Sequence, residues 1–174
     1  MPKRPIAPLV NGRVRLRLLE EADLPMTLAW RNQDHTRKWF VHSEVISAEQ
    51  HRAWYAQYKD RDDDFVFIIE ETESLKRPVG QVALYRVDWC TGRVEFGRLI
   101  IAGEDARGLG LARLATTRLL AEAHDTLGLT DVYLSVLENN TAALRVYKAC
   151  GFRITGRNDQ AVLMSAGIGN DIRR

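Results

Sequence analysis

A glycine-containing segment, Arg107-Gly108-Leu109-Gly110-Leu111-Ala112, connects an apolar run that ends at Ile101 to a long amphipathic pattern. Glycines let backbone N–H groups approach an anion closely, and the positive end of a helix dipole would lie at the same place. Both features suit a pyrophosphate. The segment has neither the lysine of a P-loop nor the complete G-x-G-x-x-G of a dinucleotide site. It therefore predicts either an anion site of a third kind or a tight strand-to-helix turn that needs glycine only for packing.

A second group of aromatic and basic residues lies in the first third of the chain. Three of the four tryptophans fall between residues 30 and 54, with Arg31 and His51 among them. Aromatic walls with basic groups can pack against a sugar ring or a nucleotide base and contact phosphates. The alternative is that these side chains only pack two helices onto a sheet. We predict a substrate-binding set consisting of Trp30, Arg31, Trp39, His51 and Trp54.

The composition limits the kind of protein that carries these groups. The 174 residues are 45% hydrophobic and 28% charged, which predicts one soluble globular domain. The 25 Lys and Arg residues nearly balance 23 Asp and Glu, so we expect neither a nucleic-acid nor a membrane partner. Cys90 and Cys150 match no metal-ligand spacing, and we expect no metal and a reducing compartment. No apolar run has the length of a signal peptide or a membrane span, which favours a cytoplasmic protein.

The order of predicted elements indicates how the candidate groups are positioned. Alternation of apolar and charged residues predicts strands, and apolar residues three and four apart predict helices. Ser47 and Gln50 form a capping-box pattern, Asp23 is a candidate N-cap, and the acidic run 60–64 reads as a solvated turn. The predicted strands are 13–18, 65–70, 78–87, 92–101, 131–137, 152–155 and 160–165, and the predicted helices are 20–31, 47–59, 108–127 and 140–150.

This order predicts a mixed α/β fold with a helix-flanked sheet. Three of the five prolines fall in the first eight residues, where they fix the backbone and remove hydrogen-bond donors. We therefore expect an extended N-terminal arm over 1–12, a single domain over 13–166 and a C-terminal tail over 167–174.

The chain resembles the GNAT acyltransferase superfamily in two ordered blocks. The first is [Q/R]-x-x-G-x-[G/A] at a helix start, matched by Arg107, Gly110 and Ala112. The second is V-x-x-x-N-x-x-A-x-x-x-Y-x-x-x-G-F, which runs from Val136 to Phe152. The resemblance covers nearly the whole chain and implies the GNAT fold. That fold is α/β (α+β), with a mixed, mostly antiparallel seven-stranded sheet, about four flanking helices and two central parallel strands that splay apart.

The resemblance implies acetyl-CoA as the donor, bound in the cleft between the splayed strands. Backbone amides of 108–112 would hold the pyrophosphate, and the end of the preceding strand would pair with the pantetheine arm. Asn140 would hydrogen-bond the pantetheine or position the thioester, and Tyr147 would protonate the departing thiolate. The residues expected at acetyl-CoA are Leu99, Ile100, Ile101, Arg107, Gly108, Leu109, Gly110, Leu111, Ala112, Asn140, Ala143 and Tyr147.

The acid of this reaction can be argued from chemistry as well. Acetyl transfer from a thioester to an amine needs an amine that loses a proton and a thiolate that leaves. A phenol can serve as the acid for a thiolate. Tyr147 lies seven residues, or two helical turns, after Asn140, so both can project toward one cleft. The alternative is that Tyr147 is a buried aromatic that anchors its helix.

For the base we predict Glu95, within Val94-Glu95-Phe96-Gly97. A carboxylate among apolar strand neighbours is costly to bury, and burial raises its pKa toward the useful range. The alternatives are an exposed carboxylate or an ion pair with Arg93 or Arg98. His51 or a water chain could also take the proton.

The acceptor side resembles one branch of the superfamily in particular. Trp30-Arg31-Asn32, Arg37-Lys38-Trp39, Ile46-Ser47 and His51 are similar to the N-acetyltransferases of nucleotide-linked 4-amino sugars, as in pseudaminic acid biosynthesis. Ribosomal-protein N-terminal acetyltransferases share much of this frame. Only a short turn precedes Val162, where many relatives have a longer acceptor-facing loop.

We therefore predict an acetyl-CoA-dependent N-acetyltransferase that acts by direct attack of a small-molecule amine, such as a nucleotide-linked amino sugar. The alternatives are acetylation of protein or peptide N-termini, acetylation of antibiotics or other small amines, and a non-catalytic acyl-CoA sensor. We expect a monomer or a homodimer.

Overall fold

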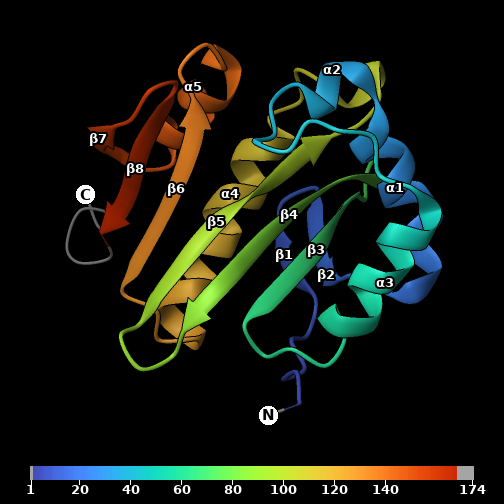
Figure 1. Ribbon diagram of the computed structural model, residues 1–174, viewed down its shortest axis with the longest axis horizontal. Helices are drawn as coiled ribbons and strands as arrows, with labels where there is room; N and C mark the ends of the chain where they lie inside the picture. The colour runs from blue at the N-terminus through green and yellow to red at the C-terminus, as the bar shows by residue number, and fades with distance from the viewer. Residues whose placement is uncertain (1, 168–174) are drawn as a thin grey trace.

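The structure is a computed structural model that describes residues 2–167. Its centre is an eight-stranded sheet with the order β1-β2-β3-β4-β5-β6-β8-β7 (Figure 1). Neighbouring strands are antiparallel except β5 and β6, which are parallel. The strands are β1 (Leu9–Asn11), β2 (Val14–Leu18), β3 (Asp64–Glu71), β4 (Arg77–Asp88), β5 (Arg93–Ile101), β6 (Asp131–Leu137), β7 (Arg153–Arg157) and β8 (Ala161–Gly167).

Helices cover both faces of this sheet. In Figure 1, α4 crosses behind the central strands, whereas α1 and α3 lie on the opposite side. The helices are α1 (Leu24–Asn32), α2 (Asp34–Arg37), α3 (Ala48–Tyr58), α4 (Leu111–Ala121), which continues as a π-helical turn over Glu122–Thr126, and α5 (Thr141–Ala149). The predicted mixed α/β architecture is thus confirmed.

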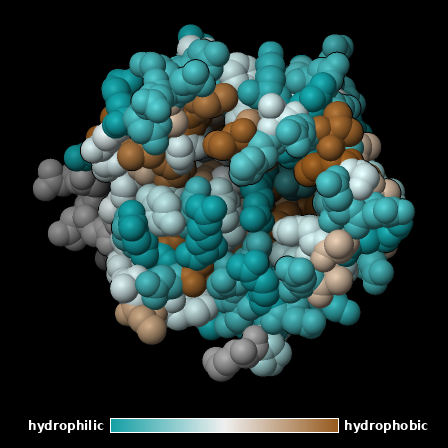
Figure 2. Space-filling view, in the orientation of Figure 1, coloured by the Kyte–Doolittle hydropathy of each residue, from teal (hydrophilic) through white to brown (hydrophobic). Residues whose placement is uncertain are grey.

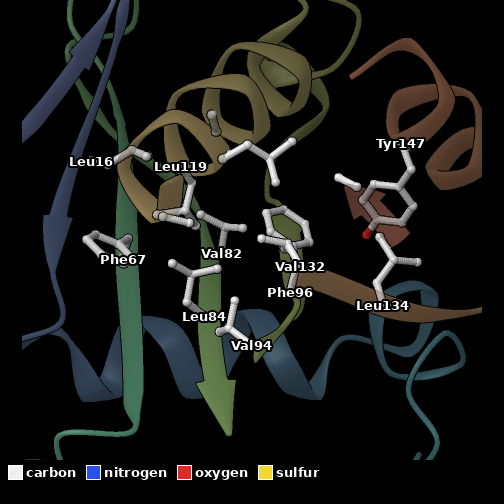
Figure 3. Close-up of a cluster of buried hydrophobic side chains, with 14 of the residues drawn as sticks. Leu16, Phe67, Val82, Leu84, Val94, Phe96, Leu119, Val132, Leu134 and Tyr147 are labelled. Atoms are coloured by element: carbon white, nitrogen blue, oxygen red, sulfur yellow. The ribbon is translucent and has the colours of Figure 1, made fainter. Parts of the chain in front are cut away.

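Strand β3 shows how the sequence builds two hydrophobic clusters. Phe65, Phe67 and Ile69 are buried in the cluster beneath α4, part of which is drawn in Figure 3. Val66 and Ile68 are buried in the cluster beneath α1 and α3. Successive side chains of a strand point to opposite faces, so a strand covered on both faces reads as a continuous apolar run.

The helix signals of the first third are confirmed in one case and modified in another. The capping box of α3 is formed: Gln50 N donates to Ser47 Oγ at 3.1 Å, and Ser47 N donates to Gln50 Oε1 at 2.8 Å. Asp23 precedes α1 as predicted but does not cap it. Its carboxylate instead accepts hydrogen bonds from Glu20 N at 2.8 Å and from the Arg17 guanidinium.

The N-terminal arm contains one strand that the sequence pattern did not predict. Leu9–Asn11 forms β1 and pairs with β2, so the sheet has eight strands rather than seven. Leu9 is buried in the cluster beneath α4, which holds this part of the arm on the sheet. Of the predicted C-terminal tail, residues 168–174 lie outside the described residues.

The acidic run 60–64 is only in part the solvated turn that we predicted: Asp60 is exposed in a turn, whereas Asp64 is not. Asp64 is buried at the start of β3 and pairs with Arg98 Nη1 at 2.7 Å. Its carbonyl accepts a hydrogen bond from Lys3, and Asp62 pairs with Arg4 at 2.7 Å. The correction has a physical cause, because a buried carboxylate is tolerated when a cation neutralises it.

The central strands separate where a site can form. β5 and β6 pair only from Arg93 to Glu95 and from Asp131 to Tyr133. The β4–β5 register shifts between Gln81 and Ala83, where β5 carries an extra residue. Arg98 occupies this bulge with φ of 53°. The end of β5 beyond the bulge therefore runs beside β6 without pairing to it.

Candidate active site

A cavity of about 470 Å³ lies between the end of β5 and α5, and we call it the α5 cavity. The end of β5, the start of α4 and the inner side of α5 contribute to its walls. Residues 35–40 add a further wall from the opposite end of the sequence. The residues predicted at acetyl-CoA that line it are Leu99, Ile100, Ile101, Arg107, Ala112, Asn140, Ala143 and Tyr147.

The start of α4 has the backbone geometry of an anion site. Gly108 and Gly110 have φ of 74° and 73°, which side-chain-bearing residues rarely adopt. No atom lies within 4 Å of where their Cβ atoms would be, so strain rather than crowding favours glycine here. Gly110 is the N-cap and offers no side chain to the first amides, and the first turn holds no acidic residue. Free amides and the helix dipole together favour a phosphate. Leu109 packs partly against the core, and the Leu111 side chain is buried there, so these two can contribute only backbone groups to that phosphate.

Asn140 has a structural task as well as a place on the cavity wall. Its Oδ1 accepts a hydrogen bond from Ala143 N at 3.3 Å, which makes it the N-cap of α5. The cap explains part of the N-x-x-A spacing by local physics, since the third helical amide lacks a partner without it. The side-chain amide nitrogen is left for another acceptor.

Tyr147 lines the α5 cavity from within the helix. Its ring packs edge-on against Phe96, at 5.8 Å between centroids, and against Phe152 at 5.6 Å. Figure 3 shows its hydroxyl oxygen on the side of Leu134 of β6. The side chain is only 7% exposed, and this burial raises the pKa of Tyr147. The phenol is therefore protonated throughout the neutral pH range, as a proton donor must be.

Glu95 lies on the face of β5 opposite α4, directly across from Tyr85 on β4. The Tyr85 hydroxyl donates to Glu95 Oε1 at 3.0 Å, and Arg86 Nη1 donates to Oε2 at 2.9 Å. The Tyr85 ring in turn lies beneath the Arg98 guanidinium, 4.1 Å from the ring centroid. Among the described residues, Glu95 does not line the α5 cavity. It also does not line the second cavity, which is described in the next paragraph. Its role as a base stays a prediction.

A second cavity, of about 420 Å³, lies on the α1–α3 side, and we call it the α3 cavity. Figure 2 shows a hollow with hydrophobic walls on that side of the molecule. Its lining includes Arg31, His51 and Trp54 from the predicted substrate set. Phe40 lines both cavities, and Arg98 of the β5 bulge lines this one next to Leu99 of the other. The two cavities therefore adjoin at the bulge.

Two predicted substrate residues lie elsewhere. Trp30 is 9% exposed and packs in the cluster beneath α1 and α3, because its position on α1 faces the sheet. Trp39 lines the α5 cavity, not the α3 cavity. For Trp30 the packing alternative therefore describes the structure, and Trp39 belongs to the wall of the donor side.

His51 is held in the α3 cavity by two contacts. Its ring stacks on Trp54 with centroids 5.5 Å apart and planes 8° apart, and its Nε2 lies 2.9 Å from Thr27 Oγ1. Thr27 donates its own proton to the Leu24 carbonyl at 3.3 Å. We therefore assign the imidazole proton to Nε2, which leaves Nδ1 as a proton acceptor. Burial lowers the pKa of His51 below 6.5, so the ring is neutral at pH 7.

Sequence reasoning missed several residues of the α3 cavity. Thr27, Gln81 and Arg98 all line it, from three different elements. Gln81 Nε2 donates to the Arg98 carbonyl at 3.3 Å and so holds the bulge. No spacing in the sequence relates these positions, because they meet only when α1, β4 and β5 are packed together.

Residues 2–167 contain no group of three or more His, Cys, Asp or Glu side chains arranged to hold a metal ion. None of the helices described there is long and apolar enough to cross a membrane.

The comparisons with known proteins agree with this geometry. The profile of the acetyltransferase (GNAT) domain family matches residues 13–153. A spermidine N(1)-acetyltransferase of Vibrio cholerae serotype O1 is 27% identical over 143 residues, which cover 82% of this chain and 80% of that protein. The structure of a Vibrio cholerae spermidine N-acetyltransferase with CoA and spermine superposes with a TM-score of 0.78 at 23% identity, covering 89% of this chain and 94% of that one. A dodecameric structure of the spermidine enzyme has a TM-score of 0.73 at 25% identity, covering 90% and 95%.

An open mixed sheet, central strands that separate and a glycine-led helix start are consistent with an acyl-CoA-dependent transferase. The family match spans most of the sequence, and the chain belongs to the GNAT acetyltransferase family. It is an acetyl-CoA-dependent N-acetyltransferase. The three relatives described above are named for spermidine and not for amino sugars or ribosomal proteins, so they do not support the branch predicted from the sequence.

Proposed function

We propose that this N-acetyltransferase acetylates the primary amine of a small molecule held in the α3 cavity. The observation that carries this proposal is the meeting of the two cavities at the β5 bulge, with Phe40 in both walls. An amine in one cavity can thus reach a thioester in the other. A peptide would need a groove, whereas a cavity of about 420 Å³ suits a small ligand.

The donor side fits acetyl-CoA through the chain's own groups. The open amides at the start of α4 suit the pyrophosphate, and the unpaired edge of β5 at Leu99–Ile101 suits the amide-bearing pantetheine arm. Acetyl-CoA supplies an activated acetyl group on a thiol that leaves readily. Tyr147 would donate its proton to the departing sulfur, which its protonated state and its place on the wall support.

For the base, Glu95 and His51 compete. Both Glu95 carboxylate oxygens already accept hydrogen bonds, whereas His51 lines the α3 cavity with a free Nδ1. This geometry favours His51 as the group that accepts the amine proton. Because burial lowers its pKa below 6.5, kcat should be constant from pH 7 to 8 and fall in more acidic solution as the ring is protonated.

Amino sugars are the acceptors we favour within the small amines. Phe40, Trp54 and the stacked His51 ring offer flat walls for a sugar. The second candidate is a polyamine, which the likeness to the spermidine enzymes favours. A polyamine carries several positive charges, yet the cavity is lined by Arg31, which has no ion-pair partner among the described residues, and by one acid, Glu44. The predicted monomer or homodimer stays a prediction, since one relative is dodecameric.

The test is release of free CoA thiol from acetyl-CoA with nucleotide-linked amino sugars, glucosamine, spermidine, aminoglycosides and peptides. We expect turnover with amino sugars. Turnover with peptides alone would overturn the proposal in favour of N-terminal acetylation, and CoA binding without turnover of any amine would indicate a sensor.

The base is tested by kcat–pH profiles of His51→Gln and Glu95→Gln with the best acceptor. We expect His51→Gln to lower kcat about 100-fold and to remove the acidic limb. A profile unchanged in His51→Gln but altered in Glu95→Gln would return the role to Glu95.

A further inference from the structure

Arg31 is held in the α3 cavity with part of its guanidinium unused. The group lies over the Phe40 ring, 4.2 Å from the centroid, and Nη2 donates to the His42 carbonyl. Nη1 is buried, and no hydrogen-bond acceptor among residues 2–167 reaches it. A buried donor without a partner costs free energy, and in a native cavity such a donor calls for an explanation.

The charge of Arg31 is also uncompensated, unlike that of its neighbour. Arg98, which also lines the cavity, is neutralised by Asp64 at 2.7 Å. Within the described part of the chain, no carboxylate forms an ion pair with Arg31. Arg37 is the charged group that acts on it, and burial together with this repulsion lowers the pKa of Arg31. The one acid on the cavity wall, Glu44, is exposed to solvent.

We propose that Arg31 is the recognition site for an anionic oxygen group, a phosphate in particular, carried by the amine substrate. The fixed, planar guanidinium offers its free N–H groups to such a group, which would satisfy the buried donor and its charge together. This inference rests on the proposed function, because it takes the α3 cavity as the acceptor site. It makes Arg31 the residue that separates phosphorylated amines from neutral amines and from polyamines.

The neighbouring groups are consistent with this assignment. His42, Gln50 and His51 line the same cavity and are neutral or weakly basic side chains with hydrogen-bonding nitrogen atoms. Trp54 and Phe40 provide the flat apolar surface for the rest of the substrate. A phosphate held at Arg31 would direct the amine away from the mouth of the cavity and toward the bulge at Arg98.

The test compares acceptors that differ only in phosphate: glucosamine, glucosamine 1-phosphate and glucosamine 6-phosphate, with spermidine as the cation. We expect kcat/KM for at least one phosphate ester to exceed that for glucosamine by 10- to 100-fold, chiefly through KM. Arg31→Met, which replaces the guanidinium over Phe40 by an unbranched apolar side chain, should lower kcat/KM for the phosphate ester to about the value for glucosamine and so remove this difference. Arg31→Lys should recover part of it, because the charge returns without the planar fork.

Arg52→Gln is the matched control, since Arg52 is exposed on α3 and does not line the cavity. It should leave the phosphate preference intact. Thermal stabilisation by CoA should be equal in wild type and Arg31→Met, which shows that the variant is folded.

A calorimetric titration of the CoA-saturated protein with the same sugars separates this inference from the proposed function. Binding of the phosphate ester that depends on Arg31, without acetylation of any amine, would refute the proposed function and retain the anion site. Acetylation of glucosamine with no preference for phosphate, equal loss for all acceptors in Arg31→Met, or preference for spermidine would overturn the anion site alone.

Discussion

The α5 cavity and the α3 cavity are built on different physical principles. The α5 cavity is walled mainly by residues 99–147, and its recognition elements are backbone groups: a strand edge and the open amides of α4. The α3 cavity is walled by side chains from α1, the loop 40–46, α3, β4 and β5. A site made of backbone needs glycines and turns at fixed spacing, whereas a site made of side chains needs only compatible shapes. The first kind therefore leaves a motif in the sequence, and the second does not.

The two cavities also differ in their charges. Arg31, Arg98, His42, His51 and Glu44 line the α3 cavity. His35, Lys38 and Arg107 line the α5 cavity, which has no acidic residue among its described lining and also holds Tyr147. The choice of acceptor should therefore follow the α3 cavity, whereas the basic residues of the α5 cavity suit the phosphates of acetyl-CoA.

The largest effect should come from Tyr147→Phe. Removing the hydroxyl removes the proposed proton donor to the thiolate, and kcat should fall about 100-fold with little change in the KM for acetyl-CoA. Because the phenyl ring keeps its contacts with Phe96 and Phe152, the thermal stability should hardly change. Tyr133→Phe on β6, outside both cavities, serves as the control and should keep full activity. An unchanged kcat in Tyr147→Phe would show that Tyr147 is not the proton donor to the thiolate.

A smaller effect should follow Gly80→Ala, which tests the backbone character of the donor side. A Cβ at position 80 would lie 2.0 Å from the Ile100 carbonyl oxygen, so β5 must move away from β4. Overpacking of this kind should cost about 3 kcal/mol of unfolding free energy and raise the KM for acetyl-CoA. Gly156→Ala on β7 is the matched control, because its Cβ would meet only Leu163 at 3.6 Å. Melting temperatures and donor KM values measure both. If Gly80→Ala is destabilised but keeps the wild-type KM for acetyl-CoA, Leu99–Ile101 do not contribute to donor binding.

The smallest effects should come from the two N-cap residues, one in each half. Asn140→Ala and Ser47→Ala each remove a cap of α5 or α3 and should each cost about 1 kcal/mol of stability. Only Asn140→Ala should also raise the KM for acetyl-CoA, because Asn140 lines the α5 cavity and Ser47 lines neither. Equal donor KM values in the two variants would show that Asn140 serves the helix alone.

Several elements could be predicted because local physics decides them. The capping box of α3 and the apolar run of β3 follow from neighbours in the sequence, and both are formed. Elements that depend on distant partners were not predictable in the same way. β1 is three residues long and becomes a strand by pairing with β2, and Asp64 is buried because Arg98, 34 residues away, neutralises it.

The sequence by itself determined the family, the mixed α/β architecture and many of the residues that line the α5 cavity, including Tyr147. These depend on glycines, caps and periodic apolar positions whose effects act within a few residues. Only the tertiary structure decided that Trp30 packs in the core, that His51 bonds Thr27, and that a buried N–H of Arg31 has no partner within residues 2–167. Those properties depend on which side chains contact one another between α1, α3 and the sheet. The spacing of residues along the chain does not predict such contacts.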